Sequence, residues 1–340
     1  RILPRESFTE TRVYSEKMTA PELVALILKA LKEKADARIG YHCTKAVVGR
    51  PVFFDDDDTG KDALAQKRLL RAVQLAGFTD VRFQYEPIAA AYAYEKSISK
   101  KEKVLVADLG GGTTDFTFIE LDPNSKKSSE RRNDIFATGG IYIGGDSFDS
   151  SFMFEKITPH FGRGLKYQSM PGKYLDLPMS LFTNICSWEK MNFFNTWKIQ
   201  REISGFYLST NHSHRLKNLQ TLIEHNLGYQ LFQQVEETKI TLSDADRAAF
   251  AFSKQGIDIQ QDITLAEYNG VIKNDIAKIE KYLDTFLAEK QINPNTVDTL
   301  FLTGGTSLVK AIQEMFRRRF PNSKIDSGDN FISVAKGMAY

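Results

Sequence analysis

The sequence predicts an α/β protein built from strand–glycine–helix units in two related halves. Glycine-rich turns follow short strand-like runs at residues 110–112, 144–145 and 304–305, far apart along the chain. Helical stripes, with apolar residues three and four positions apart, alternate with these runs. The chain has 340 residues, 42% of them hydrophobic, which is enough for two medium-sized domains with cores of their own.

Helices and strands are expected to alternate in the first hundred residues. In the first helix the apolar residues share one face, as in an amphipathic helix, and they are Leu23, Leu26, Ile27, Ala30 and Leu31. Pro87 stands in the first turn of a later helix, where its missing N–H group costs nothing. The acidic run 55–58 predicts a loop, because adjacent carboxylates repel, and a metal site is the alternative interpretation. The expected elements are helices 21–34, 63–77 and 87–98 and strands 45–48 and 81–85.

The rest of the chain adds a hairpin, a helical region and a second set of strand and helix. Strands 104–107 and 116–119 predict a hairpin with a glycine-rich tip. Thr264 and Glu267 form a capping box that begins a long helix, which ends at Asn293 and Pro294. The other expected elements are strand 135–138, a helix that opens at Gly144–Asp146, a mainly helical region 160–231, strand 299–302, helix 306–320, and a last helix capped by Asp329 that runs through Met338.

Charge and cysteine content exclude several classes of partner. The 45 Lys and Arg residues nearly balance the 43 Asp and Glu residues, so the net charge of +2 gives no general reason to expect nucleic-acid binding. The longest apolar stretch, 23–31, is far shorter than the roughly 20 residues that cross a bilayer. Cys43 and Cys186 are widely separated, which suits a reducing compartment. We therefore expect a cytoplasmic protein that binds neither nucleic acid nor membrane.

The glycine turns are the candidate binding elements. Gly110, Gly111 and Gly112 provide three adjacent positions without side chains, where a backbone can approach a phosphate closely. Asp108 and Asp115 flank them and could hold magnesium, through water, because that ion keeps much of its hydration shell. The alternative interpretation is a tight hairpin without a ligand.

A second candidate turn precedes a helix. Gly304, Gly305 and Thr306 offer unpaired N–H groups there, and a simple helix-entry turn is the alternative. The sequence contains neither a Walker A loop, nor a dinucleotide-binding glycine fingerprint, nor the G-x-S-x-G pattern of serine hydrolases. Three glycine turns in this order therefore favour a phosphate site of another type.

Five motifs carry a resemblance to a known family. Residues 104–115, VLVADLGGGTTD, resemble the second phosphate motif of the actin-like ATPases, and specifically of the DnaK-type heat-shock 70 chaperones. Upstream of it, EPIAAAYAY at 86–94 resembles the first connecting motif of that family, and VVGRP at 47–51 resembles the strand before that motif. Downstream of it, three further motifs follow in family order: GGDSFD at 144–149, the segment 236–243, and LTGGT at 302–306. The Arg50–Pro51 turn, the run 83–87 and the long middle insertion are most similar to the YegD-like branch.

The resemblance implies a ribonuclease-H-like, actin-type ATPase fold with two lobes around a nucleotide cleft. It assigns residues 1–101 to the remainder of lobe I, with 331–340 as a crossing helix. Residues 102–143 and 297–330 would form the core of lobe II, and 144–296 a mainly helical insertion subdomain in that lobe.

The same resemblance implies ATP or ADP with magnesium as cofactors and gives each candidate residue a role. Glu86 and Asp108 would position the magnesium waters and the attacking water, with Thr113 as a further catalytic residue, and Asp108 and Asp115 would hold the metal. The residues expected to bind nucleotide are Gly110, Gly111, Gly112 and Thr113 at the phosphates, Glu236, Lys239 and Ser243 at the adenosine, and Gly145, Gly304, Gly305 and Thr306 over the ribose and base. Glu236 and Lys239 would otherwise be a surface ion pair.

Two departures from the family pattern bear on activity. Ile240 and Leu308 occupy the positions of two arginines that commonly stack on the adenine, so cation–π stacking is lost. The first phosphate loop and the lysine after it are absent, which predicts poor hydrolysis of ATP unless the parent protein carries a further N-terminal segment. The abrupt beginning of the chain, without an initiator Met, favours such a segment.

Three hypotheses about function follow. The leading one is an ATP-binding, chaperone-like protein with nucleotide, and client or co-chaperone proteins, as its partners. The second is a pseudo-ATPase interaction module in which the aromatic-rich insertion binds a protein. The third is a small-molecule kinase of the same superfold, because a fold does not fix a function.

Overall fold

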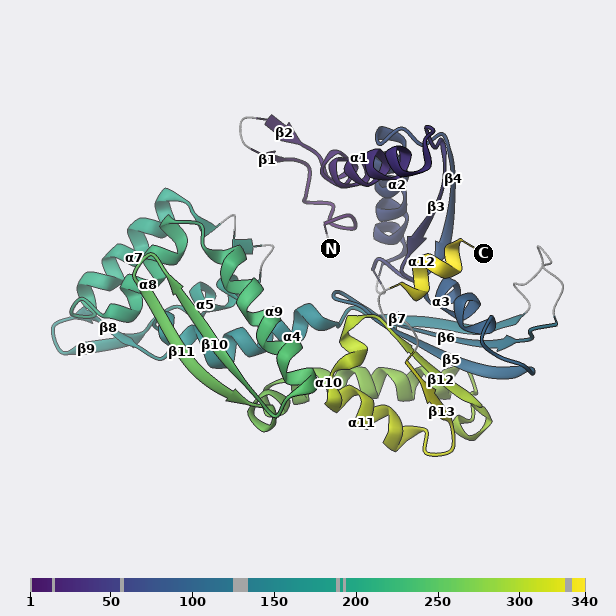
Figure 1. The fold of residues 1–340 in the computed structure, drawn as a ribbon. Coiled ribbons are helices and arrows are strands. Elements are labelled where there is room, and N and C mark those ends of the chain that lie inside the picture. Colours follow the sequence, from purple (N-terminus) through teal and green to yellow (C-terminus); the bar gives the residue numbers. More distant parts are fainter. Residues whose placement is uncertain are drawn as a thin grey trace. The chain divides into compact units, whose positions relative to one another are not determined.

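The computed structural model describes residues 2–13, 16–55, 58–124, 134–187, 190–191, 194–327 and 332–339. It is an α/β protein, as predicted (Figure 1). The chain divides into two compact units. The first unit contains Arg1–Gly145, Ile279–Leu308 and Ile312–Tyr340, and the second contains Asp146–Lys278 and Val309–Ala311.

A mixed five-stranded sheet forms the centre of the first unit. Its order is β13-β12-β5-β6-β7, with β12 parallel to both β5 and β13, and β6 antiparallel to both β5 and β7. The strands are β5 (Glu102–Leu109), β6 (Thr114–Leu121), β7 (Ile135–Ile141), β12 (Thr299–Thr303) and β13 (Lys324–Asp326). Most side chains of β5 and β6 are buried, as expected for strands covered on both faces. The predicted hairpin with its glycine tip is confirmed.

Helices cover both faces of this sheet. On one face, α3 (Glu86–Glu95) and α12 (Ser333–Met338) pack together, and α3 contributes Ala90, Ala91 and Tyr94 to the core. A Cβ atom on Gly337 would lie 1.6 Å from the Ala89 carbonyl oxygen, so glycine is required where α12 meets α3. Helices α10 (Leu265–Glu289) and α11 (Lys310–Arg319) pack against Phe116 of β6. The centre of the Phe116 ring lies 5.9 Å from that of Phe286 on α10 and 6.4 Å from that of Phe316 on α11. The predicted cap Asp329 lies outside the described residues.

The N-terminal part of the first unit contains a parallel strand–helix–strand unit. Strand β3 (Lys45–Arg50) pairs with β4 (Asp80–Tyr85), and α2 (Thr59–Leu75) connects them. The Asp58 side chain accepts hydrogen bonds from Gly60 N and Lys61 N, so α2 begins earlier than the periodicity predicted. A short hairpin of β1 (Thr11–Val13) and β2 (Glu16–Met18) precedes α1 (Ala20–Ile39).

The apolar stripe predicted for the first helix does not face a core in this structure. Leu26, Ile27 and Leu31 are 48%, 65% and 58% exposed, whereas Ala25 is buried. Helix α1 contacts α2 through a different face, on which the Lys32 ammonium lies 5.5 Å from the centre of the Phe78 ring. The helix itself is correctly predicted, and most of its apolar stripe is exposed among the described residues.

The second unit contains helices and two hairpins. The prediction of a mainly helical region 160–231 missed the hairpin of β8 (Lys166–Met170) with β9 (Lys173–Asp176). A longer hairpin of β10 (Arg247–Lys254) with β11 (Ile257–Thr264) lies in a stretch for which no element was predicted. In β10 alternate residues are buried, which is a strand signal with a period of two. The helical elements are α4 (Gly145–Phe152), a π-helix (Met153–Ile157), a 3-10 helix (Thr158–Phe161), α5 (Met179–Ile185), α7 (Trp197–Ser209), α8 (His214–Glu224), α9 (Gly228–Asp244) and the beginning of α10.

Two predicted helix boundaries have clear outcomes. The capping box is confirmed, because Glu267 Oε2 accepts hydrogen bonds from both Thr264 N, at 3.0 Å, and Thr264 Oγ1, at 2.9 Å. The predicted helix 306–320 is interrupted, since a 3-10 turn (Gly305–Leu308) precedes α11 and Ser307 Oγ donates to the Gly304 carbonyl oxygen at 2.6 Å. No helix within the described ranges is both long enough and apolar enough to span a bilayer.

Candidate functional site

The three glycine turns meet at one place in the first unit. The Gly145 amide donates a hydrogen bond to the Gly110 carbonyl oxygen at 3.1 Å, and Thr306 Oγ1 donates to the same oxygen at 2.9 Å. A Cβ atom on Gly144 would lie 2.6 Å from the carbonyl oxygens of both Gly110 and Gly111. The turns that sequence analysis singled out separately therefore form one cluster.

Gly304 shows why this cluster needs bare backbone. Its φ of +81° is in the left-handed region, and a Cβ atom there would lie 2.3 Å from the Leu109 carbonyl oxygen and 2.9 Å from Asp108 Oδ1. Neighbouring Gly305 begins the 3-10 turn that carries Thr306 toward the hairpin tip. At that tip, Gly111 is exposed, whereas Gly110, Gly112 and Thr113 are half-buried.

Three carboxylates gather beside the turns. Asp108 is the penultimate residue of β5 and Asp115 the second of β6, so that they face each other in register. They are only 7% and 2% exposed. Burial, together with the charges of Glu86 and Asp115, raises the pKa of Asp108 to about 8. Burial also raises the pKa of Glu86, while the Arg50 guanidinium opposes that shift. Glu86, Asp108 and Asp115 thus form one electrostatically linked set, and all three are residues that the sequence analysis had singled out for magnesium or its water.

Asp115 is held by two donors. Its Oδ2 accepts a hydrogen bond from Thr113 Oγ1 at 2.8 Å, and its Oδ1 accepts one from the Val52 amide at 3.3 Å. A Cβ atom on Gly140 would lie 2.4 Å from Asp115 Oδ1, so the neighbouring strand must carry glycine. Thr113, which was expected at the phosphates and in catalysis, here bonds to a carboxylate.

The acidic set fits a hydrated magnesium ion. The two buried carboxylates of Asp108 and Asp115 face each other, and the charge of Asp115 raises the pKa of Asp108. A divalent cation would neutralise this excess negative charge. Across the residues that the structure describes, no three Asp, Glu, His or Cys side chains are placed to ligate one metal ion together. Magnesium bound by one or two carboxylates, with water and phosphate as its other ligands, needs no such triad.

The expected adenosine residues share helix α9 in the second unit. Lys239 Nζ forms an ion pair with Asp149 Oδ2 at 2.7 Å, and Ser243 Oγ donates to the Lys239 carbonyl oxygen at 3.2 Å. Burial raises the pKa of Asp149, with a smaller contribution from the charge of Glu236, and Lys239 opposes the shift, so that the pKa is about 6. The alternative of a surface ion pair between Glu236 and Lys239 therefore gives way to a buried pair of Lys239 with Asp149.

Sequence reasoning missed two charged residues. Asp149 lies within the quoted GGDSFD segment, one turn after the glycines, and its position there was a usable signal. Arg50 was noted only as part of an Arg-Pro turn, but it is 6% exposed and acts electrostatically on Glu86.

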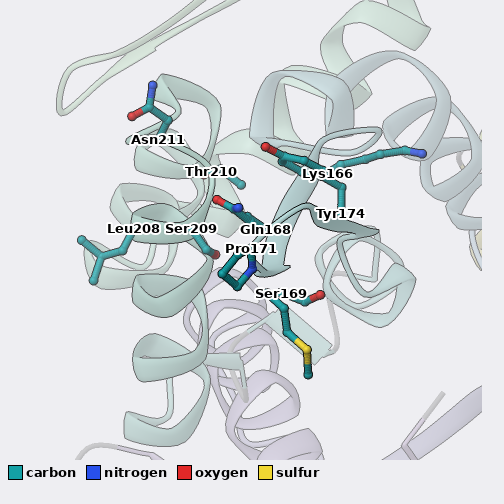
Figure 2. A pocket seen from close by; sticks show the side chains of 10 residues that line it. Lys166, Gln168, Ser169, Pro171, Tyr174, Leu208, Ser209, Thr210 and Asn211 are labelled. Atoms are coloured by element: carbon teal, nitrogen blue, oxygen red, sulfur yellow. The ribbon is translucent and has the colours of Figure 1, made fainter.

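An open groove of about 680 Å³ lies elsewhere in the second unit, between the β8–β9 hairpin and the end of α7 (Figure 2). The side chains of Gln168, Tyr174 and Leu208 are among those that line it. None of the residues predicted to bind nucleotide or metal lines this groove.

Comparison with models of protein families identifies the family to which the chain belongs. A model of the family described as Hsp70 protein matches residues 5–168 and 209–340. The matched residues include all three glycine turns, the three carboxylates and the candidate residues of α9. The segment between the matched ranges includes much of the lining of the groove. With most of its length matched, the chain belongs to the Hsp70 protein family.

Proposed function

We propose that this chain binds ATP or ADP with magnesium at the cluster of three glycine turns and works as an ATP-dependent chaperone of the YegD-like branch. The Hsp70 family has the actin-like ATPase fold, and its members generally bind ATP or ADP with magnesium and act with client or co-chaperone proteins. The observation that carries the proposal is that the Gly110 carbonyl oxygen is bonded from both other turns, beside Asp108 and Asp115.

The hairpin tip is proposed to hold the β- and γ-phosphates. Gly111 and Gly112 offer backbone amides without obstructing side chains, and the exposure of Gly111 leaves room for an anion. The Gly110 amide instead donates to the Thr113 carbonyl oxygen at 3.0 Å and closes the tip. Thr306 and Gly145 fix the tip from the other side, so that the amides are preorganised before a nucleotide arrives. The turns that carry Gly145 and Gly304–Thr306 are proposed to close over the ribose and base.

Asp108 and Asp115 are the residues that would hold magnesium through water. Magnesium, when bound, neutralises charge on the phosphates. Glu86 and Asp108 would orient the attacking water through their carboxylate oxygens, and the charge of Arg50 favours the ionised form of Glu86. On α9, Glu236, Lys239 and Ser243 are proposed to contact the adenosine, with Asp149 holding the Lys239 ammonium.

Hydrolysis is proposed to need a first phosphate loop from outside these 340 residues. The unit β3–α2–β4 and the unit β12–α11–β13 are both parallel strand–helix–strand units. Strand β12 also pairs with β5, which leads into the glycine tip, whereas β3 pairs only with β4 in the described part of the chain. These 340 residues alone should therefore bind nucleotide more readily than they hydrolyse it.

Calorimetric titration of ATP and ADP, with and without magnesium, tests the proposal. We expect saturable binding to the unmodified chain and loss of binding in Gly111→Asp, because a carboxylate at the tip repels phosphate. Gly205→Asp is the matched control, since it adds the same charge on α7 where no atom lies within 4 Å of an added Cβ. Absence of saturable binding at millimolar nucleotide, or equal binding by Gly111→Asp, would overturn the proposal.

A further inference from the structure

Arg50 is a buried cation whose guanidinium is fully engaged. It lies at the end of β3 and is only 6% exposed. Its Nε donates to the Pro51 carbonyl oxygen at 3.0 Å, and its Nη2 donates to the Val52 carbonyl oxygen at 3.2 Å. Nη2 also lies 2.8 and 2.9 Å from the two carboxylate oxygens of Asp62 on α2, and Nη1 bonds to Gln66. A guanidinium with this many partners fixes its surroundings in one arrangement.

The partners of Arg50 close the turn 51–54 at both ends. Arg50 holds the two carbonyl groups at the start of the turn, and Asp62 Oδ1 accepts a hydrogen bond from the Phe54 amide at 2.7 Å at its end. The centre of the Phe54 ring lies 4.8 Å from the Arg50 guanidinium carbon, and that of Tyr85 lies 5.4 Å from it. The buried ion pair of Arg50 with Asp62 therefore determines the path of this turn.

The turn delivers one hydrogen bond to the acidic set. Val52 is 3% exposed, and its amide donates to Asp115 Oδ1 at 3.3 Å. This bond joins the backbone just after β3 to a side chain of the hairpin that carries the glycine tip. At the other side of β3, a Cβ atom on Gly49 would lie 3.1 Å from Glu86 Cγ, so the strand passes close to a second member of the set.

We propose that Arg50 is a positioning residue for the magnesium site, which it serves by holding the turn 51–54 so that the Val52 amide fixes the Asp115 carboxylate. The part of the inference that concerns magnesium rests on the proposed function. The part that says Arg50 holds the Val52 amide against Asp115 concerns this chain alone. Arg50 itself touches neither nucleotide nor metal in this account. Outer partners that orient a ligating carboxylate typically change metal affinity 10–100-fold when they are lost.

The test compares Arg50→Lys with a matched control, Arg163→Lys. Lysine keeps the charge of Arg50 but cannot bond two carboxylate oxygens and two carbonyl groups at once. Arg163 lies in the second unit, and its guanidinium likewise has several partners. Its Nε donates to Thr158 Oγ1 at 2.8 Å, and its Nη2 donates to the Glu155 carbonyl oxygen at 3.1 Å. Its guanidinium carbon lies 4.5 Å from the centre of the Phe154 ring. Two readouts are needed: hydrogen exchange of the Val52 amide without nucleotide, and the magnesium concentration that gives half-maximal ADP binding.

Arg50→Lys should accelerate exchange of the Val52 amide and raise the half-maximal magnesium concentration about tenfold or more. Arg163→Lys should change neither quantity, whatever stability it loses. Should Arg50→Lys not fold, Asp62→Asn breaks the same ion pair and is expected to give both effects. Unchanged exchange at Val52, or an unchanged magnesium requirement in a chain that binds ADP, would overturn the inference. Faster exchange at Val52 in a chain that binds no nucleotide would support the claim that Arg50 holds the Val52 amide, and it would contradict the proposed function.

Discussion

Asp108 and Asp115 face each other across the β5–β6 hairpin, and both carboxyl groups are almost completely buried. Glu86 adds a third negative charge to this arrangement. Such a group destabilises a folded protein unless a cation or a proton neutralises it. The arrangement is expected for a binding site and unexpected for a core, and it makes the first prediction.

Asp108→Asn should stabilise the nucleotide-free protein near pH 8. The folded pKa of Asp108, about 8, lies above its ordinary value of 3.8, so its favourable contribution is complete below about pH 4 and is lost as the pH rises toward 8. The variant removes that loss, so at pH 8 its free energy of unfolding should exceed that of the unmodified chain by an amount on the order of a few kcal/mol. Its thermal midpoint should therefore be higher at pH 8. Near pH 4 the two midpoints should match. An equal midpoint for the two proteins at pH 8 would contradict the buried acidic set.

Gly304→Ala should destabilise the chain much more than Gly172→Ala. Both glycines have left-handed φ angles, +81° and +78°, so each substitution carries a conformational penalty of about 1 kcal/mol. Only at Gly304 would the added Cβ atom meet backbone, at 2.3 Å from the Leu109 carbonyl oxygen, whereas nothing lies within 4 Å at Gly172. Urea denaturation should show a further loss of about 2 kcal/mol or more at Gly304, as for other overpacked sites. Similar losses at the two positions would show that the turns do not meet.

Lys239→Met should destabilise the chain in a pH-dependent manner. The substitution leaves the Asp149 carboxylate buried without its cation, and a broken buried pair costs about 3–5 kcal/mol. Because the folded pKa of Asp149 is raised to about 6, and rises further without Lys239, the effect should be largest at pH 8 and small near pH 4, where the carboxyl group is protonated.

The matched control for that ion pair is Lys156→Met. Lys156 pairs with Glu267 at 2.7 Å, but that carboxylate is exposed, and exposed ion pairs contribute little to stability. Denaturation midpoints for both variants between pH 4 and pH 8 decide the matter. A loss of stability for Lys239→Met that does not vary with pH would contradict the buried pair.

Ile27→Asp should leave the unfolding free energy of this chain nearly unchanged. Ile27 is 65% exposed on the stripe of α1, and exposed substitutions usually change stability by less than about 0.5 kcal/mol. Ile279→Asp is the control, because Ile279 is fully buried and a charge there should prevent stable folding. Strong destabilisation by Ile27→Asp would show that the stripe is covered by a part of the chain.

The sequence was sufficient to predict the glycine turns and most of the elements around them. Gly144 and Gly304 are confined to glycine by backbone contacts, and glycine runs of this kind are visible in the letters themselves. Helix α10 was predicted for a similar reason, since its capping box and its apolar stripe depend on residues a few positions apart.

Features that depend on long-range contacts were not predictable in this way. The spacing of Leu26, Ile27 and Leu31 identified a helix, but only the neighbours of α1 determine which face is covered. Arg50 and Asp149 looked like ordinary charged residues, because their burial arises from partners on other elements. The β8–β9 hairpin is almost wholly exposed, so its hydrophobic pattern gives little strand signal.

The most direct test of the central claim is a titration of the ¹⁵N-labelled chain with ADP and magnesium, followed by amide resonances. The account predicts that the amides of Gly110–Thr113, Gly145 and Gly305 shift together and saturate at one nucleotide concentration, because the three turns form one phosphate site. Gly172 and Gly256, which have open space around them, should not move. Shifts confined to one turn, or no shifts at saturating ADP, would contradict the account.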